Sequence, residues 1–426
     1  MDSIPYRRLF PWLNISRAFS IARDPRNLLI ALAGLVLMSA GNWFTSHISN
    51  EFILSGDIVP YSSSNAPSRR SISPNRIDAQ YIGIRLPQEN IYVRLWQPFR
   101  QLITPAKHIF FPRAGLVSTW ADTATSWTLF FWYLLVWSLC GGAITRQAAS
   151  QFARQKTLSL QESLGFSRKL FVSYFSAPLL PFVAIGALYL LNFAFGLLGL
   201  IPEVGPVIVG ALWFIPLIFS LLMAIVVVCI AICWPLMYPA ISVEGSDAFD
   251  GLSRSYSYLI AKPWQLAGYV LFAAVNGIIA LGIVQLMLML TVYLSLWSVT
   301  GSWGDRELFF NSEYIYHLLG DSSASEYMVH NSNPGLVAIG YWIEGTRWLL
   351  HAFAYSYFWC AATIVYFVVR KSSDGTDLTE MYVPSTESPA SKSVPATTLK
   401  AVHTDAVPSL GGDGEAPPLK EPPALT

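Results

Sequence analysis

Charged residues are scarce in this sequence: they make up 12% of its 426 residues, against about a quarter in soluble domains. Six stretches of 22 to 42 residues carry no charge, and they lie between Arg26 and Glu51, Asp122 and Arg146, Lys169 and Glu203, Glu203 and Glu244, Lys262 and Asp305, and Arg347 and Arg370. An apolar helix of about 20 residues crosses a bilayer. The chain is therefore predicted to be a polytopic membrane protein and not a soluble globular one.

Other absences narrow the function. The net charge of +1 leaves no basic footprint for a nucleic acid. The sequence has no phosphate-binding glycine loop, no nucleophile elbow and no pair of histidines at metal spacing. We expect no catalytic residue, no cofactor and no metal, and hence no enzyme. The four cysteines all fall in predicted spans, where Cys229 and Cys233 form either a metal or redox pair or small residues of a packed helix.

The predicted fold is all-α, with six transmembrane helices and amphipathic cytoplasmic surface helices. The expected spans are about 28–46, 124–145, 170–201, 207–238, 265–297 and 348–369 within a transmembrane domain 28–369. We expect Pro178 and Pro181 to kink the opening turns of the third span. We expect the fourth span to be one long tilted helix. The first span reads as an uncleaved anchor, with a cleaved signal peptide as the alternative.

Three further segments have their own character. The extracytoplasmic loop 47–122 contains helical spacing of apolar residues from Ile91 to Ile103, which predicts an interfacial or docked amphipathic helix. In the loop 239–264 the pattern predicts a surface helix over about 246–260 with an apolar stripe. The tail 370–426 is rich in proline and poor in aromatics, so we expect it to be disordered, and we expect residues 375–426 to be dispensable for folding.

Basic residues predict the orientation. The segment 1–27 and the loop 146–169 hold five each, whereas the turn 201–206 holds none. Because short cytoplasmic loops of membrane proteins are enriched in Lys and Arg, we expect a multi-pass protein of the cell (inner) membrane with both termini cytoplasmic.

Polar residues inside or at the ends of spans are the candidate ligand or partner contacts. Within the spans these are Asn192, Asn276 and Gln285, whose alternative role is hydrogen bonding between helices. At the outer end of the sixth span, Glu344, Arg347 and His351 share one helix face, as a ligand site or as a solvated helix end.

A short echo links two loops: Gly165-Phe-Ser-Arg168 and Gly251-Leu-Ser-Arg254. Two copies of a span, a surface helix and a span would form a parallel repeat, and chance similarity is the alternative. The run from Glu244 to Tyr258, followed by Pro263-Trp264, resembles a loop of bacterial polytopic proteins similar to the membrane domain of glycerophosphodiester phosphodiesterases. The resemblance covers about 60 residues and implies a membrane module without a catalytic residue.

These features favour a non-enzymatic integral membrane protein that acts in scaffolding, in assembly or in sensing the bilayer. Its expected partners are the lipid bilayer and either other proteins or further copies of itself. A transporter or channel for a small or lipidic solute is the alternative, and it requires the polar span residues to converge on one cavity. A membrane enzyme that acts on lipid is a third reading, and it requires acids and histidines clustered at one interface. Glu344 and His351, together with the acidic loop 298–340, are the only such place in the sequence.

Overall fold

The computed structural model describes residues 11–48, 120–300 and 334–383, and within these ranges all regular secondary structure is helical. Six helices are long and apolar enough to cross a membrane. They are α3 (Pro25–Ile48), α5 (Trp120–Arg154), α8 (Leu179–Leu197), α10 (Phe214–Glu244), α12 (Pro263–Thr300) and α15 (Pro334–Asp374). The described chain therefore has the fold class that its sequence predicts, a helical protein with six candidate spans. The expected interfacial helix of the loop 47–122 lies outside the described residues.

The third candidate span begins later than predicted. A six-residue helix, α7 (Phe171–Ser176), comes first, and α8 starts only after Ala177 and Pro178. Proline lacks the N–H that an interior helical position must donate. Pro178 therefore prevents α7 from running on into α8 as one continuous helix. The 3-10 turn η3 (Leu198–Leu200) then ends the span.

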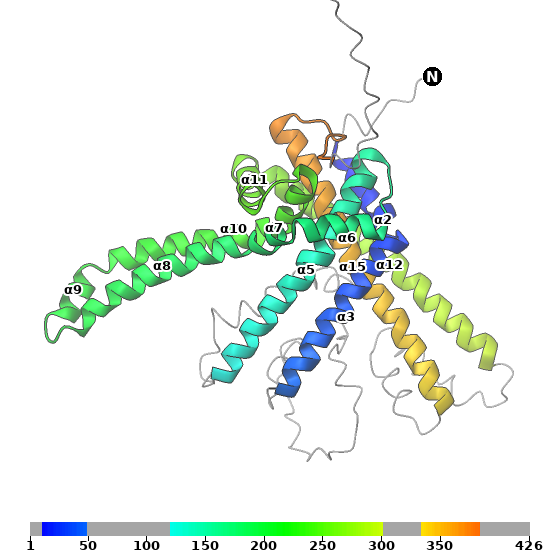
Figure 1. Ribbon diagram of the computed structural model, residues 1–426, viewed down its shortest axis with the longest axis horizontal. Coiled ribbons are helices and arrows are strands. Elements are labelled where there is room, and N and C mark those ends of the chain that lie inside the picture. Colours follow the sequence, from blue (N-terminus) through cyan, green and yellow to red (C-terminus); the bar gives the residue numbers. More distant parts are fainter. Residues whose placement is uncertain (1–10, 49–119, 301–333, 384–426) are drawn as a thin grey trace, which may run out of the picture. The chain divides into compact units, whose positions relative to one another are not determined.

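The predicted single helix over 207–238 is wrong at both ends. α9 (Gly205–Ala211) stops at Leu212, and α10 begins at Phe214. Pro216 explains the break, because it has no N–H to donate to the carbonyl four residues earlier, at Leu212. Figure 1 shows α8 and α10 running side by side, with α9 between them in the chain.

At its other end, α10 continues through Pro235 and Pro239 to Glu244. Within the predicted loop 239–264, the part before the surface helix therefore shrinks to residues 245–247, with Gly245 at φ +65° ending α10. A left-handed residue at this position is the common way for a helix to end, and glycine adopts it without a Cβ penalty. The predicted surface helix follows as α11 (Ala248–Ala261) and is confirmed.

Each of the six long helices has one of its two ends at the same end of the bundle, which we call the capped end. There α3, α8 and α12 begin, and α5, α10 and α15 end. Arg26 at the start of α3 donates to the carbonyl of Leu158 just beyond α5 (2.8 Å), and Tyr258 of α11 donates to Asp374 at the end of α15 (2.6 Å). The helix α6 (Leu160–Lys169) also lies here, against α5.

The N-terminal segment packs at this end as well. It forms η1 (Pro11–Ser16) and α2 (Arg17–Ala22), and both elements contact α15. Ile15 and Ala18 are fully buried, and Ser356 of α15 donates to the carbonyl of Ala22 (2.8 Å). The segment 11–22 is therefore part of the folded bundle.

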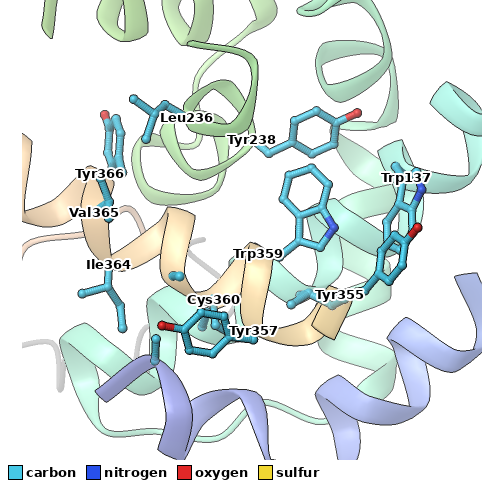
Figure 2. Close-up of a cluster of buried hydrophobic side chains, with 14 of the residues drawn as sticks. Trp137, Leu236, Tyr238, Tyr355, Tyr357, Trp359, Cys360, Ile364, Val365 and Tyr366 are labelled. Carbon is cyan, nitrogen blue, oxygen red and sulfur yellow. The ribbon is translucent and has the colours of Figure 1, made fainter. Parts of the chain in front are cut away.

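An aromatic core joins α5, α10 and α15 (Figure 2). Trp137 of α5 stacks on Tyr355 of α15 with ring centroids 4.8 Å apart, and Trp359 lies 4.8 Å from Tyr238 of α10. All four side chains are buried. Such ring pairs add about 0.5–1.5 kcal/mol each beyond their buried area, so this core fixes how the three helices meet.

The predicted boundary of disorder at residue 370 is wrong for the start of the tail. α15 continues to Asp374, and residues 375–383 lie within the described structure. Tyr382 donates its backbone N–H to the carbonyl of Val243 (2.7 Å), while Leu378 and Met381 pack against the buried core. Composition missed this docking because a few well-placed contacts suffice for a short segment. The rest of the predicted disordered tail, 384–426, lies outside the described residues.

The two capped-end connections share one architecture. In each, a long helix is followed by a short amphipathic helix with a side-chain N-cap, Ser159 for α6 and Asp247 for α11. Alignment by these caps does not superpose the echoed glycines, since Gly165 lies six residues after its cap and Gly251 only four. The echoed residues are thus out of register in the two units, which favours chance similarity for the echo itself, and the parallel repeat stays a prediction.

Candidate functional site

A charged cluster at the end of α10 joins three helices. Arg370 Nε lies 2.9 Å from Glu244 Oε1 in an ion pair, and Tyr366 of α15 donates its hydroxyl to the same oxygen at 3.1 Å. Arg254 of α11 lies 3.6 Å from that oxygen. The Arg370 side chain is only 7% exposed and that of Glu244 15%. A buried charge must be paired to be tolerated, so this carboxylate fixes the ends of α10 and α15 and the position of α11.

Arg146 forms a second buried contact nearby. Its Nη1 donates to the carbonyls of Ser242 and Tyr382, each at 3.0 Å, and its guanidinium lies 4.0 Å from the centroid of the Phe166 ring. Tyr174 and Ser242 share a hydrogen bond of 2.7 Å beside it. Burial raises the pKa of Tyr174, so its hydroxyl stays protonated. This contact ties α5, α6, α7 and α10 to the start of the tail.

Two further bonds connect α11 and its C-terminus to α15. Burial, and then the neighbouring Asp374, raise the pKa of Tyr258 to about 12, so the neutral hydroxyl donates to that carboxylate. Lys262, which follows α11, donates to the carbonyl of Ser372. A displacement of α11 would therefore act directly on the last turn of α15.

α11 has three distinct faces. Gly251, Ser255 and Tyr258 are buried against the bundle, whereas Asp250 and Ser257 are exposed and form a polar face. A third, apolar flank contains Phe249 and Ile260, which are 67% and 76% exposed, together with the half-buried Tyr256. The predicted stripe of Phe249, Leu252, Tyr256 and Leu259 lies on this flank and only partly faces the bundle.

The apolar flank continues into the next candidate span. Trp264, in the first turn of α12, is 88% exposed. Because α12 begins directly after α11, the flank lies where that span would enter a bilayer. Amphipathic rings and large apolar side chains in this position are typical of helices lying at the membrane–water boundary.

The residues singled out near the N-terminal end of the sixth span lie together in α15. Arg347 contacts Glu344 at 3.4 Å, with 17% and 29% of the two side chains exposed, and His351 is buried. They belong to a helix that starts ten residues before Glu344, at Pro334. Both uses of this trio, as a ligand site and as a helix end, remain predictions.

The polar residues of the spans have separate surroundings. Asn192 of α8 donates to the Ser220 hydroxyl of α10 at 3.2 Å, which is a bond between helices. Asn276 donates to the carbonyl of Phe272 in its own helix at 2.8 Å. Gln285 is half-buried, nine residues after Asn276 and close to the opposite face of α12. The bond of Asn192 thus fits the structural alternative of hydrogen bonding between helices, whereas the bond of Asn276 lies within its own helix.

In the described part of the chain, Cys229 and Cys233 do not belong to a metal site. Cys233 is buried and donates to the Ser255 carbonyl of α11 at 3.5 Å, while Cys229 is half-buried. Among the described residues, no group of three or more His, Cys, Asp or Glu side chains is placed to hold a metal ion. In this part of the chain the two cysteines act as packed side chains of α10.

Sequence reasoning missed Glu244, Arg370 and Arg146 as site residues, because it used these three charges only to delimit and orient the spans. A usable signal existed, since all three delimit uncharged stretches. Charged residues that end the spans on one side of a bilayer all lie near the same boundary of its apolar layer. Their meeting at one end of the bundle was therefore open to prediction, although their pairing was not.

These features define a helical protein with six candidate spans whose buried charges gather at one end, beside an amphipathic helix and a docked tail segment. Comparison of the chain with protein-family models, curated proteins and solved structures finds no match.

Proposed function

We propose that this chain is a non-enzymatic membrane scaffold that presents its C-terminal tail and adjusts its hold on that tail to the state of the bilayer. The observation that carries the proposal is the three-faced helix α11. Its apolar flank faces away from the bundle, while its other side reaches the end of α15 through Tyr258 and Asp374.

The physical link runs from lipid to tail in short steps. Lipid contact on Phe249 and Ile260 sets the depth of α11. Arg254 lies next to Glu244, and Glu244 contacts Arg370. Arg370 also donates to the carbonyl of Glu380 at 2.8 Å. A change in the depth of α11 would thus alter the contacts that hold the first residues of the tail.

The basic residues near the capped end support its placement on the cytoplasmic side of the cell membrane. In that orientation the tail is available to cytoplasmic proteins or to another copy of the chain. The resemblance of the segment from Glu244 to Trp264 to the membrane domain of glycerophosphodiester phosphodiesterases agrees with a membrane module and supplies no catalytic role.

The first test measures whether the apolar flank of α11 touches lipid. Nitroxide labels are placed at Phe249→Cys and Ile260→Cys in bilayer nanodiscs, with Asp250→Cys and Ser257→Cys on the polar face as matched controls. The proposal expects oxygen-rich, water-poor surroundings at the first pair and the reverse at the second. Equal accessibility at all four positions would reject the lipid contact.

The second test measures coupling to the tail. Hydrogen exchange of the Tyr382 amide, which is bonded to Val243, is compared in phosphatidylcholine bilayers with and without phosphatidylglycerol. The native chain should exchange at different rates in the two bilayers, and a Phe249→Ser/Ile260→Ser chain should not. If the Tyr382 amide of the native chain exchanges at the same rate in both bilayers, the proposed response to the bilayer is rejected and only the scaffold role remains.

A further inference from the structure

The first residues of the tail occupy a defined surface at the capped end. We call residues 378–382 the strap and the surface formed by Arg146, Val243, Gly245 and Arg370 the cradle. The cradle collects residues of α5, the end of α10 and α15, so it exists only in the assembled bundle.

The cradle recognises mainly the backbone of the strap. Arg370 donates to the carbonyl of Glu380 at 2.8 Å, and Arg146 donates to the carbonyl of Tyr382 at 3.0 Å. The N–H of Tyr382 donates to the Val243 carbonyl at 2.7 Å. These contacts hold the backbone of residues 380–382 irrespective of most side chains, whereas Leu378 and Thr379 lie in a turn closed by the Glu380 N–H and the Asp377 carbonyl at 3.2 Å.

Three side chains of the strap add selectivity. Leu378 and Met381 pack against the buried core. The ring of Tyr382 lies on Gly245, where a Cβ atom would approach ring carbon Cδ1 to 2.3 Å. The absence of a side chain at Gly245 therefore provides the seat for an aromatic ring, and the strap pattern is two apolar residues three apart followed by an aromatic one.

The two arginines have further partners that hold them in position. Arg146 also donates to Ser242 and covers the Phe166 ring, and Arg370 contacts Glu244. Their guanidinium groups are therefore positioned by the bundle itself. Preorganised donors lose little freedom on binding, which favours affinity.

We infer that the cradle is a peptide-binding site, which the chain's own strap fills in this structure, and that it takes any peptide that adopts the conformation of the strap and carries the same apolar–apolar–aromatic pattern. The inference goes beyond the proposed function, because it requires no contact between α11 and lipid. A second copy of the chain, which carries the same strap, is a ready source of such a peptide.

The resident strap has an advantage over any free peptide. Only residues 375–377 separate it from the end of α15, and a short tether gives an effective concentration of about millimolar. A peptide at micromolar concentration should therefore bind only when the resident strap has been weakened.

The experiment uses the full chain in nanodiscs and a dye-labelled peptide of residues 376–383. The strap is weakened in the chain by Leu378→Ser/Met381→Ser/Tyr382→Ser, and hydrogen exchange of the Tyr382→Ser amide verifies its release. Fluorescence anisotropy should show that the peptide binds this variant at least roughly tenfold more tightly than it binds the native chain. A peptide with the same three substitutions serves as the control and should not bind.

A fourth substitution tests the seat itself. Gly245→Asn, added to the weakened chain, keeps a residue that tolerates left-handed backbone but fills the space of the aromatic ring, so peptide binding should be lost. Failure of the native peptide to bind the released chain overturns the inference. Equal binding to the native and the weakened chain, or binding that survives Gly245→Asn, would also overturn it, because the peptide would then bind elsewhere.

Discussion

Glu244→Gln tests the charged cluster most directly. The substitution keeps the shape of the side chain and an accepting oxygen but removes the negative charge that faces Arg370 at 2.9 Å. Removing one partner of a buried ion pair costs about 3–5 kcal/mol, because the other charge stays behind in a poor solvent. Since the Glu244 side chain retains 15% exposure and Gln can still accept from Tyr366, we expect a loss of about 3 kcal/mol, at the low end of that range.

The matched control is Glu344→Gln near the start of α15. Glu344 contacts Arg347 at 3.4 Å, and its side chain is 29% exposed. Ion pairs with more solvent contribute about 0–1 kcal/mol. The same chemical change at this position should therefore have a much smaller effect on the free energy of unfolding.

The assay is reversible unfolding in mixed micelles with increasing sodium dodecyl sulfate, followed by circular dichroism at neutral pH. Each variant is compared with the native chain in free energy of unfolding. The double variant Glu244→Gln/Arg370→Gln should lose less than the sum of the two single changes, because the pair is coupled. If Glu244→Gln costs no more than Glu344→Gln, or if the two changes simply add, the cluster does not hold the helix ends together.

Two further predictions follow from the capped end. Gly251→Ala should destabilise the protein by about 1–3 kcal/mol through overpacking, since its Cβ would lie 2.8 Å from Ile241. Gly165→Ala has open space around it and should be neutral or stabilising by up to about 1 kcal/mol in thermal or detergent unfolding. Equal effects of the two substitutions would mean that the echoed glycines are equivalent after all. Truncation after Ser373 should cost about 1–3 kcal/mol by leaving buried donors of the bundle without the strap, while truncation after Val383 should leave membrane yield and unfolding unchanged; a harmless Ser373 truncation would restore the view that the whole tail is dispensable.

Local patterns predicted much of the fold. The uncharged stretches gave the fold class and the number of candidate spans, because the chemistry of a bilayer acts on each segment separately. α11 was predicted from its helical spacing and its acidic start, and Asp247 indeed accepts the N–H of Asp250 at its N-terminus. Predictions of this kind need no knowledge of what the helix packs against.

Breaks and docked segments were harder to predict, for physical reasons that differ. The interruption near Leu212 depends on Pro216, four residues later, and the length of the uncharged run concealed it. The strap depends on carbonyl contacts to arginines far away in the chain. Composition predicts whether a segment can form its own core, but it does not predict whether an existing core offers that segment a few matching partners.

The charges that delimit the uncharged stretches show why the Glu244 cluster forms. At the capped end these residues are Arg26, Arg146, Lys169, Glu244, Lys262 and Arg370, whereas at the opposite ends of the same stretches they are Glu51, Asp122, Glu203, Asp305 and Arg347. Glu244 is thus the single acidic residue in a set of six that is otherwise basic. An acidic side chain at this position is stabilised by the excess positive charge around it, and Arg370 and Arg254 provide the contacts. The negative charge of Glu244 therefore has a structural reason. It attracts Arg370 and Arg254 to the end of α10, whereas a basic residue at position 244 would repel them.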